Sequence, residues 1–339
     1  MSLPFAVSSK SLIKKHLSQD TYKRLETLVT ASGFTLEKAI QSGIANPDSS
    51  IGIYLGDAES YELFSDVLTP VIEDYHGVAK PQIHQADFSP VKLSDPDPEK
   101  KYILSTRVRV ARNIENYNFT CHLSLQERKC LEQDVIEALQ VLPAGLAGTY
   151  HSFEGEVDKS LLFKKGDRFQ EAAGINSDFP KGRGIFYSED TRFRIWLGEE
   201  DHLRLISQES STDLANVYNH LGQALIFLEK HLKFIKDNRY GYLTTCPTNL
   251  GTSMRAGVHI RLRNLAENRI LLREIVDRHQ LQLRGTGGEN TEVEDCVFDI
   301  SNKRRLGLSE KAIITGLYSG LLAIIDAEKT LVNNGEVYV

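Results

Sequence analysis

The stretch RFRIWLGEEDHLRLIS, residues 192–207, decides the class of fold. Apolar and polar residues largely alternate in its two halves, 192–197 and 202–207, which is the pattern of strands with one buried face. Only the residues GEED separate the halves, and so short a connection joins antiparallel strands in a hairpin. The sequence therefore predicts a sheet that is at least partly antiparallel, with an acidic turn at one end of the hairpin.

Strand and helix patterns alternate on both sides of the hairpin. Further short β-type runs are found at 102–106, 184–188, 240–246, 257–262, 281–284 and 297–300. Apolar residues recur at helical spacing over 124–140, 212–235 and 309–332. We therefore expect residues 101–339 to form an α+β domain in which helices flank a mainly antiparallel β-sheet.

The N-terminal part of the chain has a different pattern. Between residues 9 and 76 apolar residues recur at helical spacing, and a turn-rich loop at 46–54 interrupts them. Prolines and small polar residues then dominate 77–100. The length of 339 residues also favours two domains. We therefore predict a small all-α domain at 1–80, a linker at 81–100, and the α+β domain after it.

Charge and composition narrow the function classes. The formal net charge of -6 and the pI near 6.0 argue against nucleic acid or an anionic membrane as the main partner. No apolar run approaches the ~20 residues of a membrane-spanning helix, and we expect no secretion signal. The four cysteines lack metal-binding spacing, which is typical of a reducing compartment. We therefore expect a cytoplasmic protein without nucleic-acid or membrane partners.

Five arginines stand at strand ends or loop starts. They are Arg107, Arg109, Arg204, Arg255 and Arg284, and strand alternation places the first two on one face. Guanidinium groups stay charged and bind phosphate oxygens in pairs, so their convergence would create a polyphosphate site. The chain has neither a P-loop nor a Rossmann glycine motif. The alternative is that each arginine is an ordinary solvated or salt-bridged surface residue.

A second group of candidates combines a thiol with carboxylates. In LTTCPTNLGTSMR, residues 243–255, a β-branched run ends at Cys246, so we expect a strand that presents this thiol at a loop mouth. Nearby arginines would then favour the thiolate. The acidic turn at 199–201 and Glu289, in a glycine-rich loop, could hold a planar cation such as a guanidinium between two carboxylates. A solvated acidic turn and a buried structural thiol are the alternatives.

The sequence CPTNLGT, residues 246–252, resembles the signature of the phosphagen (guanidino) kinases, and its Thr248 is similar to the arginine kinase branch. Similar blocks occur in the family's order at 52–54, 57–61, 74–77, 105–109, 166–169, 182–186, 199–204, 258–260, 284–286 and 299–307. The resemblance covers nearly the whole chain. It implies a glutamine synthetase-like guanidino kinase fold and reversible transfer of the γ-phosphoryl group of MgATP to a guanidino nitrogen.

The resemblance also implies roles for individual residues. Nucleotide binding is implied for Arg107, Arg109, Arg204, Arg255, Arg284 and, against the adenine, His259. Substrate binding is implied for Ser49, Ser50, Ile51, Tyr54, Glu200, Cys246, Thr248 and Glu289. Catalysis is implied for Glu200, Glu289, Cys246 and Arg255. Magnesium would bind through the nucleotide phosphates and water, with no direct protein ligand and with Glu199 orienting one water. Asp48 and Arg168 would bridge the two domains.

Several positions differ from the arginine kinase pattern. They are Ser50, Ser160, Tyr187, Gly287 and Asn290. We expect phosphorylation of L-arginine to phosphoarginine, with taurocyamine or a related guanidine as the alternative substrate. Two further functions stay open, namely a kinase that acts on arginine side chains of proteins and a non-catalytic sensor of nucleotide or arginine. A monomer and a homodimer both stay open as well.

Overall fold

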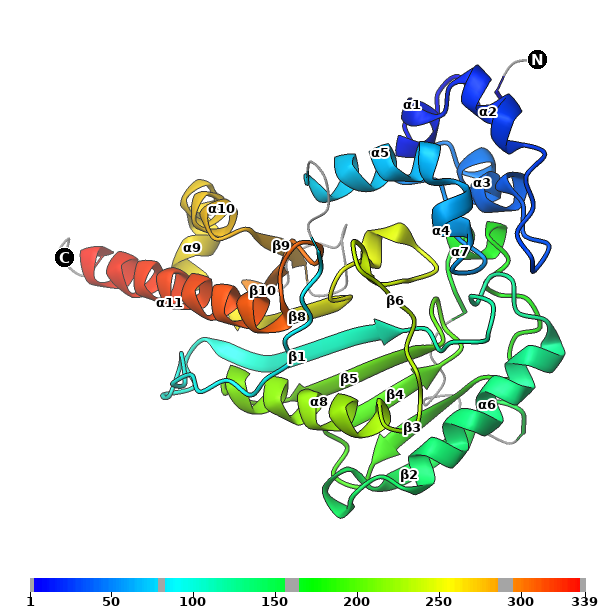
Figure 1. Ribbon diagram of the computed structural model, residues 1–339. Helices are drawn as coiled ribbons and strands as arrows, with labels where there is room; N and C mark the ends of the chain where they lie inside the picture. Colours follow the sequence, from blue (N-terminus) through cyan, green and yellow to red (C-terminus); the bar gives the residue numbers. More distant parts are fainter. Residues whose placement is uncertain (1–2, 79–82, 156–164, 286–294, 336–339) are drawn as a thin grey trace.

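A small helical body lies beside one large sheet in the computed structural model, which describes residues 3–78, 83–155, 165–285 and 295–335 (Figure 1). The helices of the small body are α1 (Leu12–His16), α2 (Gln19–Leu25), α3 (Leu36–Ala45), α4 (Ser60–Leu63) and α5 (Ser65–His76). The turn-rich loop at 46–54 contains no helix or strand and connects α3 to α4. The predicted all-α domain is confirmed.

Local sequence signals set the ends of these helices. The hydroxyl of Ser18 accepts a hydrogen bond from the backbone N–H of Thr21 at the start of α2, and Thr35 does the same for Lys38 in α3. Gly77 ends α5 in the left-handed conformation with φ at 63°, where a residue with a side chain would be strained.

One antiparallel sheet organises the rest of the described chain. Its strand order is β2-β3-β4-β5-β1-β8-β10-β9, and every neighbouring pair is antiparallel. The strands are β1 (Ile103–Arg112), β2 (Gly148–Ser152), β3 (Gly184–Ser188), β4 (Phe193–Leu197), β5 (Leu203–Glu209), β8 (Met254–Arg261), β9 (Leu281–Gly285) and β10 (Val297–Asn302). β4 and β5 form the predicted hairpin, with Leu197 opposite Leu203. The expected mainly antiparallel sheet is confirmed.

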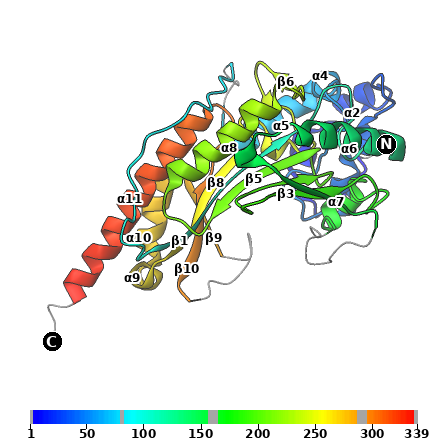
Figure 2. The same ribbon diagram turned by 90° about the horizontal axis from the view of Figure 1, so that it is seen from below.

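Long helices cover one face of this sheet. α8 (Leu214–Leu228) and α11 (Glu310–Gly335) lie side by side on it (Figure 2). Val108 and Val110 of β1 are buried in the same core as these helices. Arg107 and Arg109 therefore lie on the opposite face, as predicted. The other helical elements are α6 (Leu125–Gln140), η1 (Ala144–Leu146), α7 (Arg168–Ala172), η2 (Pro247–Asn249), α9 (Arg263–Glu267) and α10 (Arg269–Arg278).

The predicted strand at 240–246 is wrong. Only β7 (Gly241–Tyr242) forms there, and it pairs with β6 (Lys236–Asp237) outside the main sheet. The backbone after β7 bonds to loops instead, because the carbonyl of Thr245 accepts the N–H of Leu55 at 2.8 Å and the N–H of Thr245 donates to Asp201 at 2.7 Å. β2, α7, α9 and α10 were not predicted, and the helix predicted to reach residue 235 ends at Leu228.

The apolar core of the small domain continues into the larger domain. We call this continuation the shared core; its residues from the larger domain are Phe119, Ile175, Tyr240, Leu243, Cys246, Leu250 and Leu306. Hydrogen bonds also cross, since the Tyr61 hydroxyl donates to the Thr244 carbonyl at 2.7 Å and His76 Nε2 lies 2.9 Å from the Pro247 carbonyl. The small domain thus packs directly on the segment that carries Cys246.

The linker region has no regular secondary structure over residues 83–100. The domain boundaries at 80 and 101 stay a prediction. Among the residues that the structure describes, no helix combines the length and apolar character needed to cross a membrane.

Candidate active site

Adjacent strands bring the predicted arginines together on the uncovered face of the sheet. Arg109 of β1 lies opposite Arg255 of β8 in the strand register. Arg204 lies on β5, which pairs with β1 on the side away from β8. Arg107 lies two residues before Arg109 on the same face of β1. Arg284 lies on β9, separated from β8 by β10. Four of the five arginines, Arg107, Arg109, Arg204 and Arg255, thus lie near one another, while their binding of a polyphosphate stays a prediction.

Two hollows open beside Arg255. The lining of the first includes Ser105, Arg107, His259 and Asp299. The lining of the second includes Arg109, Arg204, Asn249, Ser253 and Arg305. His259 is four residues from Arg255 along β8, a span of about 13 Å. The site is therefore elongated, with an imidazole at one end and guanidinium groups along the rest.

The positive charge of this site is only partly compensated. Arg255 donates to Asp299 at 2.9 Å, and Arg204 pairs with Glu199. The side chains of Arg107 and Arg109 make no hydrogen bond or ion pair with any residue that the structure describes. Burial and then repulsion by the surrounding arginines lower the pKa of Arg109 well below its usual value, and burial lowers the pKa of Arg255 to about 10. A polyanion would relieve this repulsion.

Arg305 is a member of the cluster that the sequence analysis did not identify. Its Nη1 donates to the carbonyl of Thr248 at 2.9 Å and to Asn249 Oδ1 at 3.0 Å. Burial lowers the pKa of Arg305. It lies in a run of three basic residues, 303–305, which in sequence looks like a solvated turn. Arg305 thus connects the arginine cluster to the loop at 246–253, which we call the cysteine loop. Only the folded chain shows this connection.

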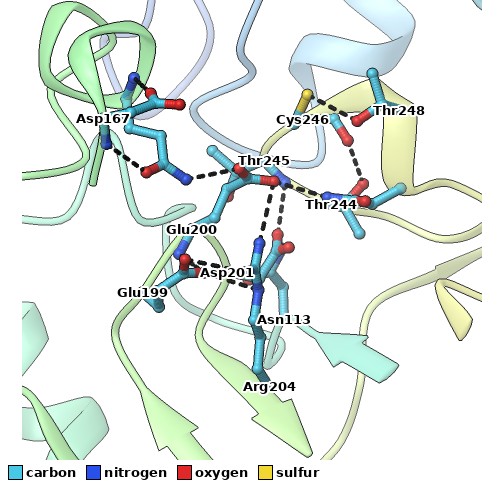
Figure 3. Close-up of polar contacts among 12 residues, drawn as sticks. Asn113, Asp167, Glu199, Glu200, Asp201, Arg204, Thr244, Thr245, Cys246 and Thr248 are labelled. Atoms are coloured by element: carbon cyan, nitrogen blue, oxygen red, sulfur yellow. Dashed lines mark hydrogen bonds and ion pairs between the residues drawn. The ribbon is translucent and has the colours of Figure 1, made fainter. Parts of the chain in front are cut away.

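The three acidic residues of the hairpin turn have different surroundings (Figure 3). Glu199 binds Arg204 through both oxygens, at 2.7 and 3.0 Å. Asp201 is fully buried and accepts the N–H of Thr245 at 2.7 Å and the amide of Asn113 at 2.9 Å, so it is structural. Burial raises the pKa of Asp201 to about 6. The sequence could not separate these roles, because all three acids belong to one run.

Glu200 is the buried acid that faces the cysteine loop. It is 9% exposed, and its Oε1 accepts the side-chain amide of Asn249 at 2.7 Å. Its Oε2 accepts the side-chain amide of Gln170 at 2.8 Å, while Arg204 Nη2 lies 3.5 Å from Oε1. Neither Asn249 nor Gln170 is among the predicted site residues, since neutral amides give no charge pattern.

Cys246 lies at the start of η2, where Pro247 begins the 3₁₀ turn. Its Sγ is 3.1 Å from Thr248 Oγ1 (Figure 3). Burial and then the nearby Glu200 raise the pKa of the Cys246 thiol to about 12. The expectation that arginines favour the thiolate is therefore wrong for the unliganded protein, because burial and a carboxylate outweigh them. A cation bound between Cys246 and Glu200 would act in the opposite direction.

The small-domain loop reaches this site through one of its four predicted residues. Tyr54 belongs to the same apolar core as Cys246, and burial, followed by the charges of Cys246 and Glu200, raises the pKa of its hydroxyl. Ser49 accepts the N–H of Gly52 at 3.0 Å, and the carbonyls of Ser50 and Ile51 accept the backbone N–H groups of Leu12 and Ile13 in α1. The hydrogen bonds described for these three residues thus lie within the small domain.

The structure describes one of two further predicted features, the ion pair between the domains, but not the second carboxylate of the guanidinium clamp. Asp48 and Arg168 form the expected ion pair between the two domains. Glu289, Gly287 and Asn290 lie in 286–294, and Ser160 lies in 156–164, both outside the described residues. The second carboxylate of the predicted clamp therefore stays a prediction. In the described ranges, no group of three or more His, Cys, Asp or Glu side chains could hold a metal ion directly.

Comparison with known proteins gives matches along most of the chain. Residues 131–331 match the family model of the ATP:guanido phosphotransferase C-terminal catalytic domain, and residues 7–73 match that of the N-terminal domain. An arginine kinase of Artemia franciscana is 44% identical, over 97% of this chain and 95% of its own length. An arginine kinase of Limulus polyphemus is 43% identical, over 96% of this chain and 94% of its own length.

Solved structures of related proteins share the fold. The crystal structure of a lombricine kinase superposes with a TM-score of 0.93 at 32% identity, covering 98% of this chain and 96% of its own. The substrate-free duplicated taurocyamine kinase from Schistosoma mansoni superposes with a TM-score of 0.89 at 36% identity, covering 95% of this chain and 47% of its own.

Proposed function

The chain belongs to the ATP:guanido phosphotransferase family and is a guanidino kinase, and we propose that its substrate is L-arginine, which it converts reversibly to phosphoarginine. The observation that carries the proposal is the position of buried Glu200, between Cys246 and a cluster of incompletely compensated arginines. The relatives named arginine kinase, at 43 and 44% identity, support arginine over the substrates of the lombricine and taurocyamine kinases, at 32 and 36%.

The arginine cluster binds the phosphates of ATP in this proposal. Arg107, Arg109 and Arg255 lie on neighbouring strands, so their guanidinium groups can contact successive phosphates. His259, at the far end of the first hollow, packs against the adenine. Catalysis of phosphoryl transfer chiefly requires alignment of the reactants and stabilisation of negative charge. Side chains on rigid strands provide both without rearranging during the reaction.

Glu200 orients the attacking guanidino group. Two amide donors fix its carboxylate, so it can hold a guanidinium in one orientation and accept the proton that leaves the attacking nitrogen. Cys246 contacts the guanidinium from the other side, and Glu289 completes the clamp. Ser49, Ser50, Ile51 and Tyr54 recognise the amino-acid end, and Thr248 supports Cys246 through their contact.

Magnesium bound with the nucleotide would be held by phosphate oxygens and water, with Glu199 beside one such water. The donor set fits this arrangement, because Glu199 Oε1 accepts only Arg204 Nη1 among the described residues and keeps a free acceptor position for a water. Bound magnesium neutralises charge on the transferring phosphoryl group. Glu199 contributes by orienting that water, and Arg204 fixes Glu199.

A coupled assay for ADP release tests the proposal. We expect turnover with MgATP and L-arginine, and at least tenfold lower kcat/KM with taurocyamine, lombricine and creatine. Glycine in place of arginine controls for ATP hydrolysis. Turnover with taurocyamine but not with arginine would exclude arginine as the substrate. Nucleotide binding in calorimetry without turnover on any guanidino compound would favour the sensor.

Taurocyamine is the second candidate, and Ser50 is the residue that favours it. Ser50 is exposed in the loop at 46–54, at a position where the resemblance predicts glycine. Its hydroxymethyl group reduces the room for a carboxylate and adds a donor for a sulfonate. Ser50→Gly should then raise kcat/KM for arginine relative to taurocyamine, and an unchanged ratio would remove Ser50 from substrate choice.

A further inference from the structure

Neutral amides hold both oxygens of the Glu200 carboxylate, and one of them, Gln170, lies on α7, which contacts α3 of the small domain. We propose that Gln170 is a positioning residue that links docking of the small domain to the orientation of Glu200. The inference rests on the proposed function, because it assumes that Glu200 binds the guanidino group.

The side chain of Gln170 is fixed at both ends. Its Oε1 accepts the backbone N–H of Asp167 at 3.1 Å, and the Asp167 carboxylate in turn accepts the N–H of Phe169 and of Gln170. These bonds form the capping box of α7. Because Oε1 faces a donor, Nε2 must face Glu200, to which it donates at 2.8 Å. Gln170 is buried, so its position is set by these bonds.

The two residues before Gln170 are bonded to the small domain. The hydroxyl of Ser42, on α3, donates to the carbonyl of Phe169 at 2.8 Å. Arg168 pairs with Asp48, in the loop that follows α3. α7 therefore lies between the small domain and Glu200, and a shift of the small domain would move the amide that holds the catalytic carboxylate.

The chemistry explains why this donor is an amide. A carboxylate has about four acceptor positions, of which Gln170 and Asn249 each take one, on different oxygens. Two positions stay open for the forked donors of a guanidinium. Arg204 Nη2 already lies 3.5 Å from Oε1, so a second cation at position 170 would cancel more of the negative charge and compete with the substrate. A neutral donor fixes the geometry without adding positive charge.

Kinetic measurements on Gln170→Met and Gln170→Glu test the positioning role. Methionine removes both hydrogen bonds, while glutamate keeps the acceptor for Asp167 and places a second carboxylate beside Glu200. We expect kcat to fall ten- to a hundredfold, more for Gln170→Glu, with the KM for MgATP within twofold of wild type. The control is Glu171→Gln, an exposed neighbour on α7 that contacts Asn176 and not Glu200, and we expect near-normal turnover. Unchanged kcat in both Gln170 variants would overturn the proposal.

The link to the small domain needs a double-mutant cycle. Ser42→Ala removes the hydrogen bond to Phe169 and should lower kcat about threefold in the wild-type background. In the Gln170→Met background the same change should have no further effect, because Glu200 has already lost its contact with α7. Additive losses would overturn the link.

A crystal structure of Gln170→Met decides the positioning role without any turnover. We expect the Glu200 carboxylate to leave its place beside α7, and an unchanged Glu200 conformation would overturn the proposal. If the wild-type chain phosphorylates no guanidino compound, the proposed function fails, and this structure still tests what holds Glu200.

Discussion

Replacing Glu200 with glutamine separates the chemical role of this side chain from its structural role. The carboxylate accepts amide donors at both oxygens, from Asn249 at 2.7 Å and from Gln170 at 2.8 Å. An amide at position 200 can offer an acceptor to only one of them. Whichever way it turns, its own NH₂ group meets another donor.

Glu200→Gln should lower turnover and stability for different reasons. The two remaining acceptor positions of Glu200 can make two charge-assisted hydrogen bonds to a guanidinium, each contributing about 1.5–3 kcal/mol. Their loss should lower kcat by about 10²- to 10⁴-fold. The donor that faces the new NH₂ group loses its partner, which should lower the free energy of unfolding by about 1–3 kcal/mol.

The double variant Glu200→Gln with Gln170→Glu is the matched control. It reverses the polarity of the contact, so the amide at 200 can donate to the carboxylate at 170 and accept from Asn249. We expect thermal denaturation to show recovered stability, while the coupled assay still shows the low kcat of Glu200→Gln. ADP affinity in calorimetry should stay within threefold of wild type throughout. A kcat within tenfold of wild type for Glu200→Gln, or recovery of kcat in the double variant, would refute this reasoning.

Three further results are expected. Arg109→Met should raise the free energy of unfolding of the unliganded protein by about 1–2 kcal/mol, because it removes a half-buried charge that neighbouring arginines repel, and should weaken ADP binding at least tenfold; a lower denaturation temperature would contradict this. Cys246→Ser should lower kcat less than Glu200→Gln, since the side chain orients and does not attack, and trapping of a phosphocysteine would contradict that role. Burial lowers the pKa of His202 to about 4, and its Nδ1 accepts the N–H of Ile114, so the unfolded chain binds a proton at higher pH than the folded one. Stability in urea titrations should therefore fall by up to about 3 kcal/mol as pH drops from about 6.5 to 4, and His202→Gln should flatten that slope.

The parts of the fold that follow local rules were predictable. The four-residue turn required a hairpin, and alternation placed Arg107 and Arg109 opposite the core valines. The segment before Cys246 was not predictable in the same way. Its β-branched residues look like a strand, yet Thr245 bonds to Leu55 and Asp201, which are distant in sequence.

The charged residues of the candidate site were predictable from the sequence. The arginines and Glu200 stand out in an acidic protein, and the family resemblance adds their roles. Gln170 and Asn249 carry no such signal, since amides are common and their partner is far away in the chain. The protonation of Cys246 also depends on burial, which the sequence does not show.

The shared core has a consequence for the order of synthesis. The small-domain helices end at His76, but Leu243, Cys246 and Leu250 belong to the same apolar core. At about 5–20 residues per second, roughly 8–35 s pass on the ribosome before the later segment is made. During that interval the nascent small domain exposes an apolar face, so we expect it to depend on chaperones until the cysteine loop arrives.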